Sequence, residues 1–417
     1  MTNNRWIIVL AVATMSFVGM GVFVYSRGVF LPQLAETFDG QRLDIALGFS
    51  LEMTVGALIS PFLGRYLDRG SIRRVLLFGI AMMTAGYVAL SYTQTLLQFY
   101  LVMGALFGFA MPCLGSFTWQ KLIINWFRQN RGLALALGVL GASTAGVVIP
   151  PLATFLVEHV GWRMTYVIFG LVVAVTLVPV VVFVVRDAPD RPTPSPGSAE
   201  PSLEGRVFTT AETLKMPAFW AIAVVFGMML CVFGAVMLHL YSHLIDQGMS
   251  TYQAATVLSV VAGCSALGKP AVGAMADWLG GRPTIWFALA LQFIAMLIIA
   301  AVDTYAMALT AAVIYGFGYS GILPLRSFAM AATVGHRSFG SANGLLRPAM
   351  WPLQVSASPL AGYIYDQSGS YETAFYVLAG FVAVAAFGPF FIPSREESAE
   401  PAGRPSEATM EQPATGK

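Results

Sequence analysis

The stretch Gly64-Arg65-Tyr66-Leu67-Asp68-Arg69-Gly70, followed by Arg73 and Arg74, joins two long apolar runs of the chain. A related stretch, Gly273-Ala274-Met275-Ala276-Asp277, followed by Gly280, Gly281 and Arg282, joins two later runs, and its aspartate lies 209 positions after the first (277 − 68). Other landmarks recur 208 positions apart: Gly132 with Gly340, Pro151 with Pro359, and Gly161-Trp162-Arg163 with Gly369-Ser370-Tyr371. Two halves that echo one another in this way predict a duplicated membrane bundle, an architecture whose members mostly move solutes.

The composition excludes a soluble globular protein. Of the 417 residues, 57% are hydrophobic and only 11% are charged, whereas soluble proteins average about a quarter charged residues. The apolar runs are about 20 residues long, enough to cross a bilayer as helices, and backbone in lipid must satisfy its own hydrogen bonds. We therefore predict an all-α membrane protein with twelve transmembrane helices, at residues 6–30, 45–64, 75–94, 96–120, 132–157, 162–185, 218–245, 252–274, 284–302, 305–332, 340–364 and 372–393.

The basic residues gather on one side of this layout. Apart from charges inside helices, the other side keeps only Arg42 and Arg163. The basic side holds Arg65, Arg69, Arg73, Arg74, Lys121, Arg128, Arg131, Arg186, Arg191, Arg206, Lys215, Arg282, Arg337 and Arg395. The positive-inside rule predicts that this side, with both chain ends, is cytoplasmic, and we expect a multi-pass protein of a bacterial cytoplasmic (inner) membrane.

The sequence gives no sign of an enzyme, a cofactor or a metal site. Cys113, Cys231 and Cys264 lie in different predicted helices, and the chain shows no paired carboxylates, metal-ligand cluster or Walker loop. The net charge of +2 gives no reason to expect nucleic acid as a partner. We expect a monomer whose partners are the lipid bilayer, a small organic anion and protons.

One polar stretch divides the chain. The linker at 187–216 is rich in proline, and Thr209 with Glu212 three residues later predicts a capped short helix near its end. The predicted parts are an N-terminal six-helix bundle (1–186), this cytoplasmic linker, a C-terminal six-helix bundle (217–393) and a disordered cytoplasmic tail (394–417).

With these motifs the chain resembles a major facilitator superfamily transporter over nearly its whole length. The first loop is similar to that superfamily's Gly-x-x-x-Asp-Arg-x-Gly-x-Arg pattern with one extra residue before Arg73, and the second copy has Trp278 where the first has Arg69. Three further stretches resemble monocarboxylate porters and oxalate/formate exchangers: Asn125-Trp126-Phe127 leading to Arg131-Gly132-Leu133-Ala134, then Gly268-Lys269-Pro270, then Gly369-Ser370-Tyr371 with Ala374-Phe375.

The repeated loops predict a gate. An aspartate at the end of one helix can accept hydrogen bonds from the N-terminus of a neighbouring helix and pair with arginine, which would make a latch that forms and breaks. We assign this gating role to Asp68, Arg69, Arg73, Asp277 and Arg282, while the alternative is that the arginines only anchor the topology.

Charges inside the predicted helices indicate the substrate. Arg27, Lys269, Arg326 and Arg347 stand against one carboxylate, Glu52, and a charge near the bilayer centre costs about 2.5–3.5 kcal/mol, so such residues usually face a partner or a water-filled path. A surplus of positive charge favours an organic anion. We expect Arg326 to be an anchor, and Arg27 to mark the outer end of helix one.

The resemblance implies that Lys269 binds the substrate carboxylate, in a place where the related porters typically have arginine. The alternative is a lysine that extends its ammonium to the cytoplasm. Arg347, with Asn343, Trp351, Gln354 and Ser358, forms a polar stripe on helix eleven and is either a second anion ligand or a cytoplasmic gate. Tyr25 is a candidate hydroxyl donor, and Tyr315 with Tyr319 form an aromatic pair that either walls the substrate, as the resemblance implies, or only packs.

Three residues are candidates for proton coupling. His239 and His243 share a face of helix seven and titrate near neutral, although a packed polar pair is the alternative. Glu52 is the third. We predict a secondary transporter for a mono- or dicarboxylate such as lactate, pyruvate, formate or oxalate, coupled to protons. The alternatives are an anion exchanger, a drug or metabolite exporter of the same fold, and a sensor that transports nothing.

Overall fold

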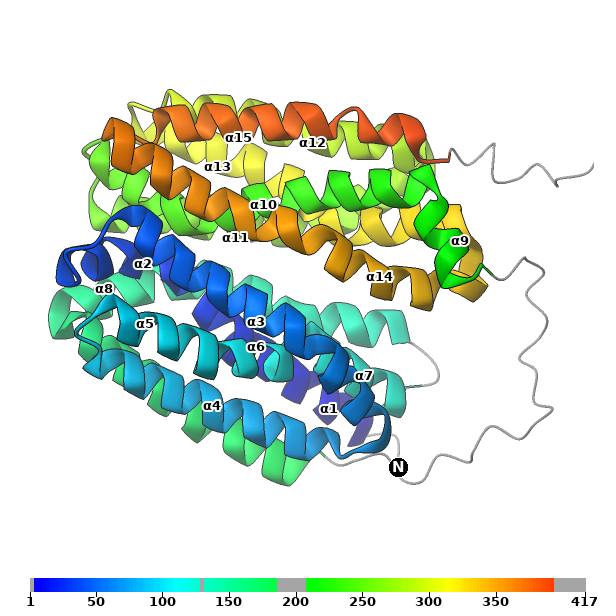
Figure 1. Cartoon of the computed structure of the whole chain (residues 1–417), viewed down its shortest axis with the longest axis horizontal. Helices are drawn as coiled ribbons and strands as arrows, with labels where there is room; N and C mark the ends of the chain where they lie inside the picture. The colour runs from blue at the N-terminus through cyan, green and yellow to red at the C-terminus, as the bar shows by residue number, and fades with distance from the viewer. Residues whose placement is uncertain (1–3, 128–130, 186–207, 394–417) are drawn as a thin grey trace, which may run out of the picture.

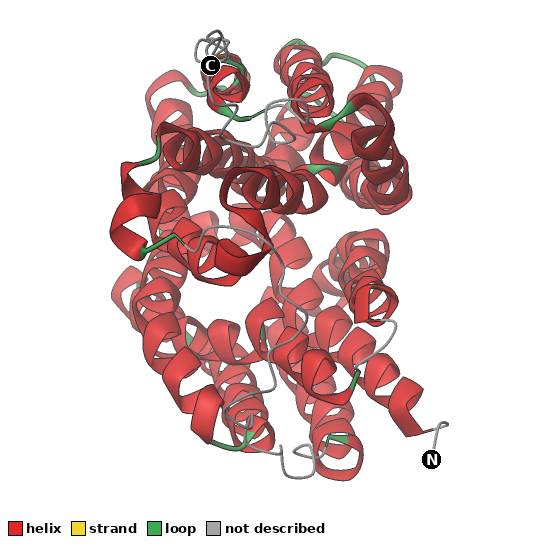
Figure 2. Ribbon diagram, turned by 90° about the vertical axis from the view of Figure 1, so that its right-hand side faces the viewer, coloured by secondary structure: helices red, strands yellow, loops and turns green. Residues whose placement is uncertain are grey.

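The fold is a bundle of long helices. The structure, a computed structural model, describes residues 4–127, 131–185 and 208–393, and the side chains of Asp68 and Arg69 lie outside this description. Within the described ranges all regular structure is helical (Figure 2). The predicted tail at 394–417 and most of the predicted linker fall outside the described residues.

The described residues before 186 form the first half of the molecule. Its helices are α1 (Asn4–Met15), the π-helical turn η1 (Ser16–Gly21), α2 (Val22–Thr37), α3 (Arg42–Arg69), α4 (Ile72–Tyr92), α5 (Leu96–Val102), η2 (Met103–Phe107), α6 (Gly108–Leu114), α7 (Ser116–Trp126), α8 (Arg131–Pro179) and η3 (Val180–Val184). In Figure 1 they form the lower layer, coloured blue to cyan-green.

The second half forms the upper layer of Figure 1. Its helices are α9 (Thr210–Lys215), α10 (Pro217–Asp246), α11 (Thr251–Leu279), α12 (Gly281–Ala300), α13 (Tyr305–Ser320), α14 (Ile322–Ser368), α15 (Glu372–Ala385) and the short η4 (Gly388–Phe391). The predicted capping box is confirmed, because Thr209 and Glu212 each accept a hydrogen bond from the other's backbone N–H at the start of α9.

The predicted twelve-helix architecture is confirmed. Ten stretches of the described residues are long and apolar enough to cross a membrane. One of them, Leu133–Val184, is 52 residues long and is divided at Gly161, so it counts as two helices. The part of α14 after Val334 is the remaining helix of the twelve. The chain must reverse direction within α14, since Arg326 and Arg347 interact electrostatically although 21 residues of straight helix would separate them by about 31 Å.

The internal repeat is visible in the backbone. Gly161 breaks α8 with φ of 78°, and Gly369, its predicted counterpart, ends α14 with φ of 71°. Residues with a Cβ rarely adopt these angles, so glycine is required at the same turn in both halves. The two halves therefore share a chain reversal as well as a sequence pattern.

The first helix is longer than predicted. It continues without a break from α1 through η1 and α2 to Thr37 instead of ending at 30, and Pro32 lies inside it. Membrane helices tolerate such prolines when neighbouring groups satisfy the freed carbonyl. Arg27 therefore lies in the interior of the helix, and its expected place at the helix end was wrong.

Two ends of the molecule are needed to describe the site. We call the right-hand end in Figure 1, which carries α9 and the turn between α3 and α4, the linker end. We call the opposite end, which carries the turns after Thr37, Asp246 and Ser368, the far end.

Candidate functional site

The two halves meet along three helix pairs. The first half contributes α2, α3 and α8, which contact α10, α14 and α11 of the second half respectively. The candidate substrate ligands Tyr25, Lys269 and Arg347 lie on α2, α11 and α14, three of these six helices. The seam between the halves is therefore the place where the predicted site residues can meet.

Lys269 spans the seam. Its Nζ atom donates a hydrogen bond of 2.7 Å to Oγ of Ser143 on α8, a residue of the other half that is 4% exposed. Among the described residues, no carboxylate lies within 4.0 Å of the ammonium. An ammonium has three donors, so a single neutral partner leaves it able to bind an anion.

Tyr25 reaches the same segment of α8. A Cβ built on Gly146 would lie 2.8 Å from the Tyr25 ring and 2.4 Å from Cβ of Ala262 on α11. These separations are shorter than the 3.5–4.0 Å at which carbon atoms usually pack, so glycine permits the close approach. Because Ser143 and Gly146 are one helical turn apart, about 4.5 Å along the axis, Lys269 and Tyr25 converge on one turn of α8.

A cation and a carboxylate of the first half interact beside Tyr25. The Arg27 guanidinium interacts electrostatically with Glu52, Tyr25 and Tyr319, and it stands 6.0 Å from the ring centre of Phe49. Glu52 is 5% exposed. An opposite charge nearby lowers the cost of burying a charged group, so Arg27 has a carboxylate to interact with inside its own half.

The predicted aromatic pair is a stack of three rings. The centres of Tyr315 and Tyr319 are 6.4 Å apart, and Tyr319 stacks on Phe233 of α10 at 4.1 Å. Tyr319 comes from the second half and Arg27 from the first, so this stack also touches the seam. The buried hydroxyl of Tyr315 has no hydrogen-bond partner among the described residues.

The polar stripe on α14 is partly unsatisfied. The Arg347 side chain is exposed and interacts with another cation, Arg326. Buried atoms without a hydrogen-bond partner among the described residues are Oδ1 of Asn343, Nε1 of Trp351 and Nε of Arg326. Such orphaned polar atoms are uncommon in packed interiors and mark a place where a polar ligand would be favourable.

The two histidines are packed within the second half. His239 is hydrogen-bonded to the Tyr371 hydroxyl at 3.2 Å and to the Ser358 carbonyl at 2.8 Å, and His243 donates to the Ile299 carbonyl at 2.8 Å. Both side chains are 0% exposed. This arrangement favours the packed polar pair over a role in proton coupling.

The predicted gating residues lie at the linker end. Asp68 and Arg69 are the last two residues of α3, and Arg73 is in the first turn of α4. Asp277 is exposed near the end of α11, whereas Arg282 donates to the carbonyls of Ile392 and Phe390 within its own half. In this conformation Arg282 therefore holds the end of the last helix.

The far end carries a closure that sequence reasoning missed. The Asp366 carboxylate on α14 accepts hydrogen bonds of 2.9 Å from the backbone N–H groups of both Arg42 and Leu43, at the start of α3. The Arg42 guanidinium also lies 5.2 Å from the ring centre of Tyr365 and donates to Ser242 of α10 at 3.4 Å. A carboxylate at a helix N-terminus is favourable, so this cap holds the halves together at the far end.

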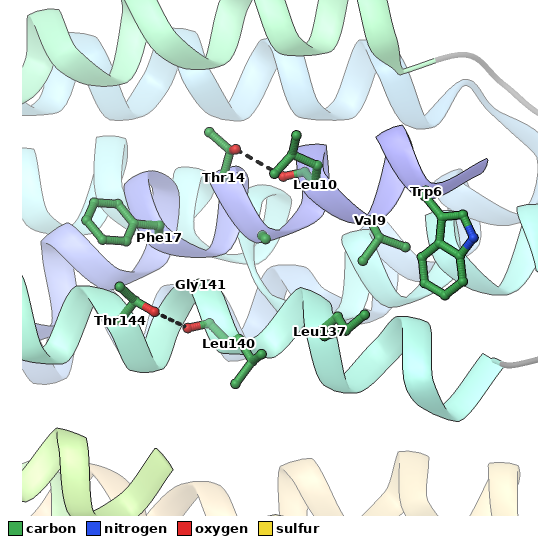
Figure 3. Close-up of a pocket in the computed structure, with 10 residues that line it drawn as sticks. Trp6, Val9, Leu10, Thr14, Phe17, Leu137, Leu140, Gly141 and Thr144 are labelled. Carbon is green, nitrogen blue, oxygen red and sulfur yellow. Dashed lines mark hydrogen bonds between the residues drawn. The ribbon is translucent and has the colours of Figure 1, made fainter. Parts of the chain in front are cut away.

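A hollow elsewhere is unsuited to an anion. Figure 3 shows the space between α1 and the linker-end part of α8, about 590 Å³ in volume, lined by Trp6, Leu10, Phe17, Leu137, Leu140 and neighbours. The hydroxyls of Thr14 and Thr144 are engaged with Leu10 and Leu140 carbonyls of their own helices. None of the described lining residues is charged.

Ser143 and Asp366 were missed for a common reason. Each depends on a partner far away in the chain: Lys269 is 126 residues from Ser143, and Arg42 is 324 residues from Asp366. A usable signal was present for Asp366, because Glu158 lies 208 positions before it and is an acid at the corresponding place of the first half.

Comparisons with known proteins agree on one family. Residues 7–353 match the model described as the Major Facilitator Superfamily. An uncharacterized MFS-type transporter of Bacillus subtilis, YcxA, is 25% identical over 404 residues, covering 92% of this chain and 93% of that protein. Monocarboxylate transporter 11 of Mus musculus is 28% identical over 400 residues, covering 92% of this chain and 86% of its own.

A solved structure shares the fold. It is a bacterial homologue of the human lysosomal transporter Spinster in an inward-facing and unoccupied conformation, with a TM-score of 0.74 at 15% identity. The match covers 94% of this chain and 97% of that one. This likeness concerns the fold alone, and the family model that matches residues 7–353 confirms the predicted family.

Proposed function

Because this chain belongs to the major facilitator superfamily, we propose that it is a secondary transporter that moves a small organic anion by alternating access. The proposed substrates are mono- or dicarboxylates of the size of lactate, pyruvate, formate or oxalate. Lys269 binds the substrate carboxylate, and Tyr25 lies close enough to the same turn of α8 to add a hydroxyl donor. The relatives named monocarboxylate transporters support this class of substrate.

The uneven charge of the interior carries the proposal. Of the four cations in the predicted membrane helices, Arg27 interacts electrostatically with Glu52, whereas Lys269, Arg326 and Arg347 have no such interaction with a carboxylate among the described residues. Taking an uncompensated charge out of water is costly. An entering carboxylate lowers that cost, so the interior favours anions over neutral or cationic solutes.

The proposed orientation places the linker end in the cytoplasm. The basic residues of the turns gather there, which is the arrangement of the positive-inside rule. With the far end held by the Asp366 cap, the conformation is then inward-facing. Uptake would proceed when the cap opens and the linker end closes through Asp68 and Asp277.

Coupling to protons is assigned to Glu52. It is a buried carboxylate that interacts with Arg27, and Arg27 also interacts with Tyr319 of the other half, so gain of a proton by Glu52 changes the charge that Arg27 meets near the seam. His239 and His243, which pack inside one half, are the weaker candidates. An anion exchanger remains the alternative, and the transport experiments below separate the two.

Binding can be tested on the purified protein. Thermal unfolding would be followed with lactate, pyruvate, formate, oxalate and larger acids, for the wild type and for Lys269→Gln. We expect at least one small acid to stabilise the wild type, and affinity to fall about 10- to 150-fold in the variant, because a hydrogen bond to a charged group is worth about 1.5–3 kcal/mol.

The control is Lys215→Gln, which makes the same change of charge on an exposed lysine of α9. It should keep the wild-type response. Wild-type affinity in Lys269→Gln would refute the assignment of the anion site.

A further inference from the structure

The bond between Lys269 and Ser143 joins the two halves through the residue proposed to bind substrate. It connects α11 of the second half to α8 of the first, at 2.7 Å, and Ser143 is the one hydrogen-bond partner of the ammonium among the described residues. A second bond joins the same two helices nearer the far end, where Ser259 donates to the Val147 carbonyl at 2.7 Å. That second bond involves no charge.

The place of Ser143 is fixed by close packing on either side. A Cβ built on Gly141 would lie 1.9 Å from the Ala13 carbonyl oxygen, and one on Gly146 would lie 2.4 Å from Ala262. The turn of α8 between them is therefore pressed against α1 and against α11. The packed backbone of this turn therefore holds the Ser143 hydroxyl next to the Lys269 ammonium.

We propose that Ser143 is a positioning residue that holds the Lys269 ammonium while the site is empty and yields it to the substrate carboxylate when the site is loaded. The inference rests on the proposed function of Lys269. Charge-assisted hydrogen bonds to an anion are roughly twice as strong as bonds between neutral groups, and a carboxylate also supplies the opposite charge. Substrate therefore displaces a serine hydroxyl without difficulty.

The consequence concerns the empty transporter. A carrier with an unpartnered buried ammonium resists closing around it, because closure removes the remaining water from the charge. Such a carrier reorients only when loaded and performs exchange. With Ser143 as a substitute acceptor, the empty carrier can also close and return, which net transport requires.

The test compares two modes of transport in proteoliposomes. The probe is whichever labelled acid of lactate, pyruvate, formate and oxalate the wild type transports. Exchange is measured with the same acid inside, and net uptake is measured with none inside. For Ser143→Ala we expect exchange to stay within about twofold of wild type while net uptake falls about tenfold, the size expected for one lost hydrogen bond to a charged group.

Two variants make the result specific. Ser143→Thr keeps the hydroxyl and should restore net uptake. Ser259→Ala removes the uncharged bond between the same helices and should leave the ratio of net uptake to exchange unchanged.

Three results would overturn the inference: an equal loss of both modes in Ser143→Ala, no loss in either, or the same signature in Ser259→Ala. These differ from failure of the proposed function, in which the wild type transports none of the four acids or Lys269→Gln retains wild-type affinity.

Discussion

At the scale of single residues, the proposed binding of an anion depends on Lys269, whose ammonium has no carboxylate within 4.0 Å among the described residues. Lys269 donates a hydrogen bond to a neutral hydroxyl, whereas Arg27 interacts electrostatically with the Glu52 carboxylate. An ammonium is a compact point charge, while a guanidinium offers a planar fork that matches both carboxylate oxygens. The choice of lysine should therefore influence which anions bind well.

The Lys269→Arg variant should separate charge from geometry. We expect it to keep partial transport, with a changed order of preference among lactate, pyruvate, formate and oxalate, since the charge is kept and the geometry of its donors differs. Competition of each unlabelled acid against one labelled acid measures the order. An unchanged order would show that Lys269 does not contact the carboxylate.

Glu52→Gln should uncouple transport from protons. The amide cannot take up and release a proton, so uptake should lose its stimulation by an inward proton gradient, while exchange should stay within about threefold of wild type. Exchange at constant pH serves as the internal control, because it needs no net proton movement. Full stimulation by the gradient in this variant would remove Glu52 from the coupling.

The residue types alone identified the charged groups inside the predicted helices, but their spacing in the sequence could not identify the partners of these groups. A lysine or glutamate inside an apolar run is readable because charge is costly there. Arg27 was misplaced because the first helix, predicted to end at residue 30, continues past Pro32 to Thr37. Ser143 is one of many small residues in its helix, and only the packing of α8 on α11 distinguishes it.

At the scale of elements, α3 and α14 form an antiparallel pair with an aspartate near the C-terminal end of each. Asp366 of α14 caps the N-terminus of α3 at the far end. Asp68 of α3 lies at the linker end, where sequence analysis predicts a latch. One pair of helices would then carry a cap for each of the two closed states.

Asp366→Asn should weaken the far-end closure. Loss of the charge weakens two hydrogen bonds to backbone N–H groups, about 1.5–3 kcal/mol in all, which shifts the population toward the state open at the far end by about 10- to 150-fold. The readout is alkylation of Ser50→Cys from the far side, since Ser50 bonds Val355 across the seam. Cys113, Cys231 and Cys264 would first be replaced.

The control for Asp366 is Asp303→Asn, an exposed aspartate between α12 and α13 at the same end of the molecule. It should leave alkylation unchanged. Asp68→Asn should shift alkylation in the opposite direction, toward protection of position 50. If Asp366→Asn and Asp303→Asn labelled alike, the cap would have no part in gating.

At the scale of the whole molecule, the duplicated sequence accounts for the architecture. Apolar runs and the repeat at 208 positions led to twelve helices in two halves, and the backbone at Gly161 and Gly369 repeats accordingly. The contacts across the seam could not be predicted from the sequence, because they join residues far apart in the chain, such as Ser143 with Lys269 and Arg42 with Asp366.

Coupling is also a property of the whole molecule. Uptake into proteoliposomes would be measured with and without an inward proton gradient, and with and without anion inside. Proton symport predicts that the gradient drives uptake into empty vesicles. Uptake that ignores the gradient and requires internal anion would establish exchange instead.

The central claim, that this protein carries small carboxylates through a site containing Lys269, is tested most directly by counterflow. Liposomes containing the purified protein are loaded with excess unlabelled lactate, pyruvate, formate or oxalate and diluted into a trace of the same labelled acid. We expect the wild type to accumulate label transiently for at least one acid, and Lys269→Gln and protein-free liposomes to accumulate none. Counterflow in Lys269→Gln equal to wild type, or its absence in the wild type for all four acids, would contradict the claim.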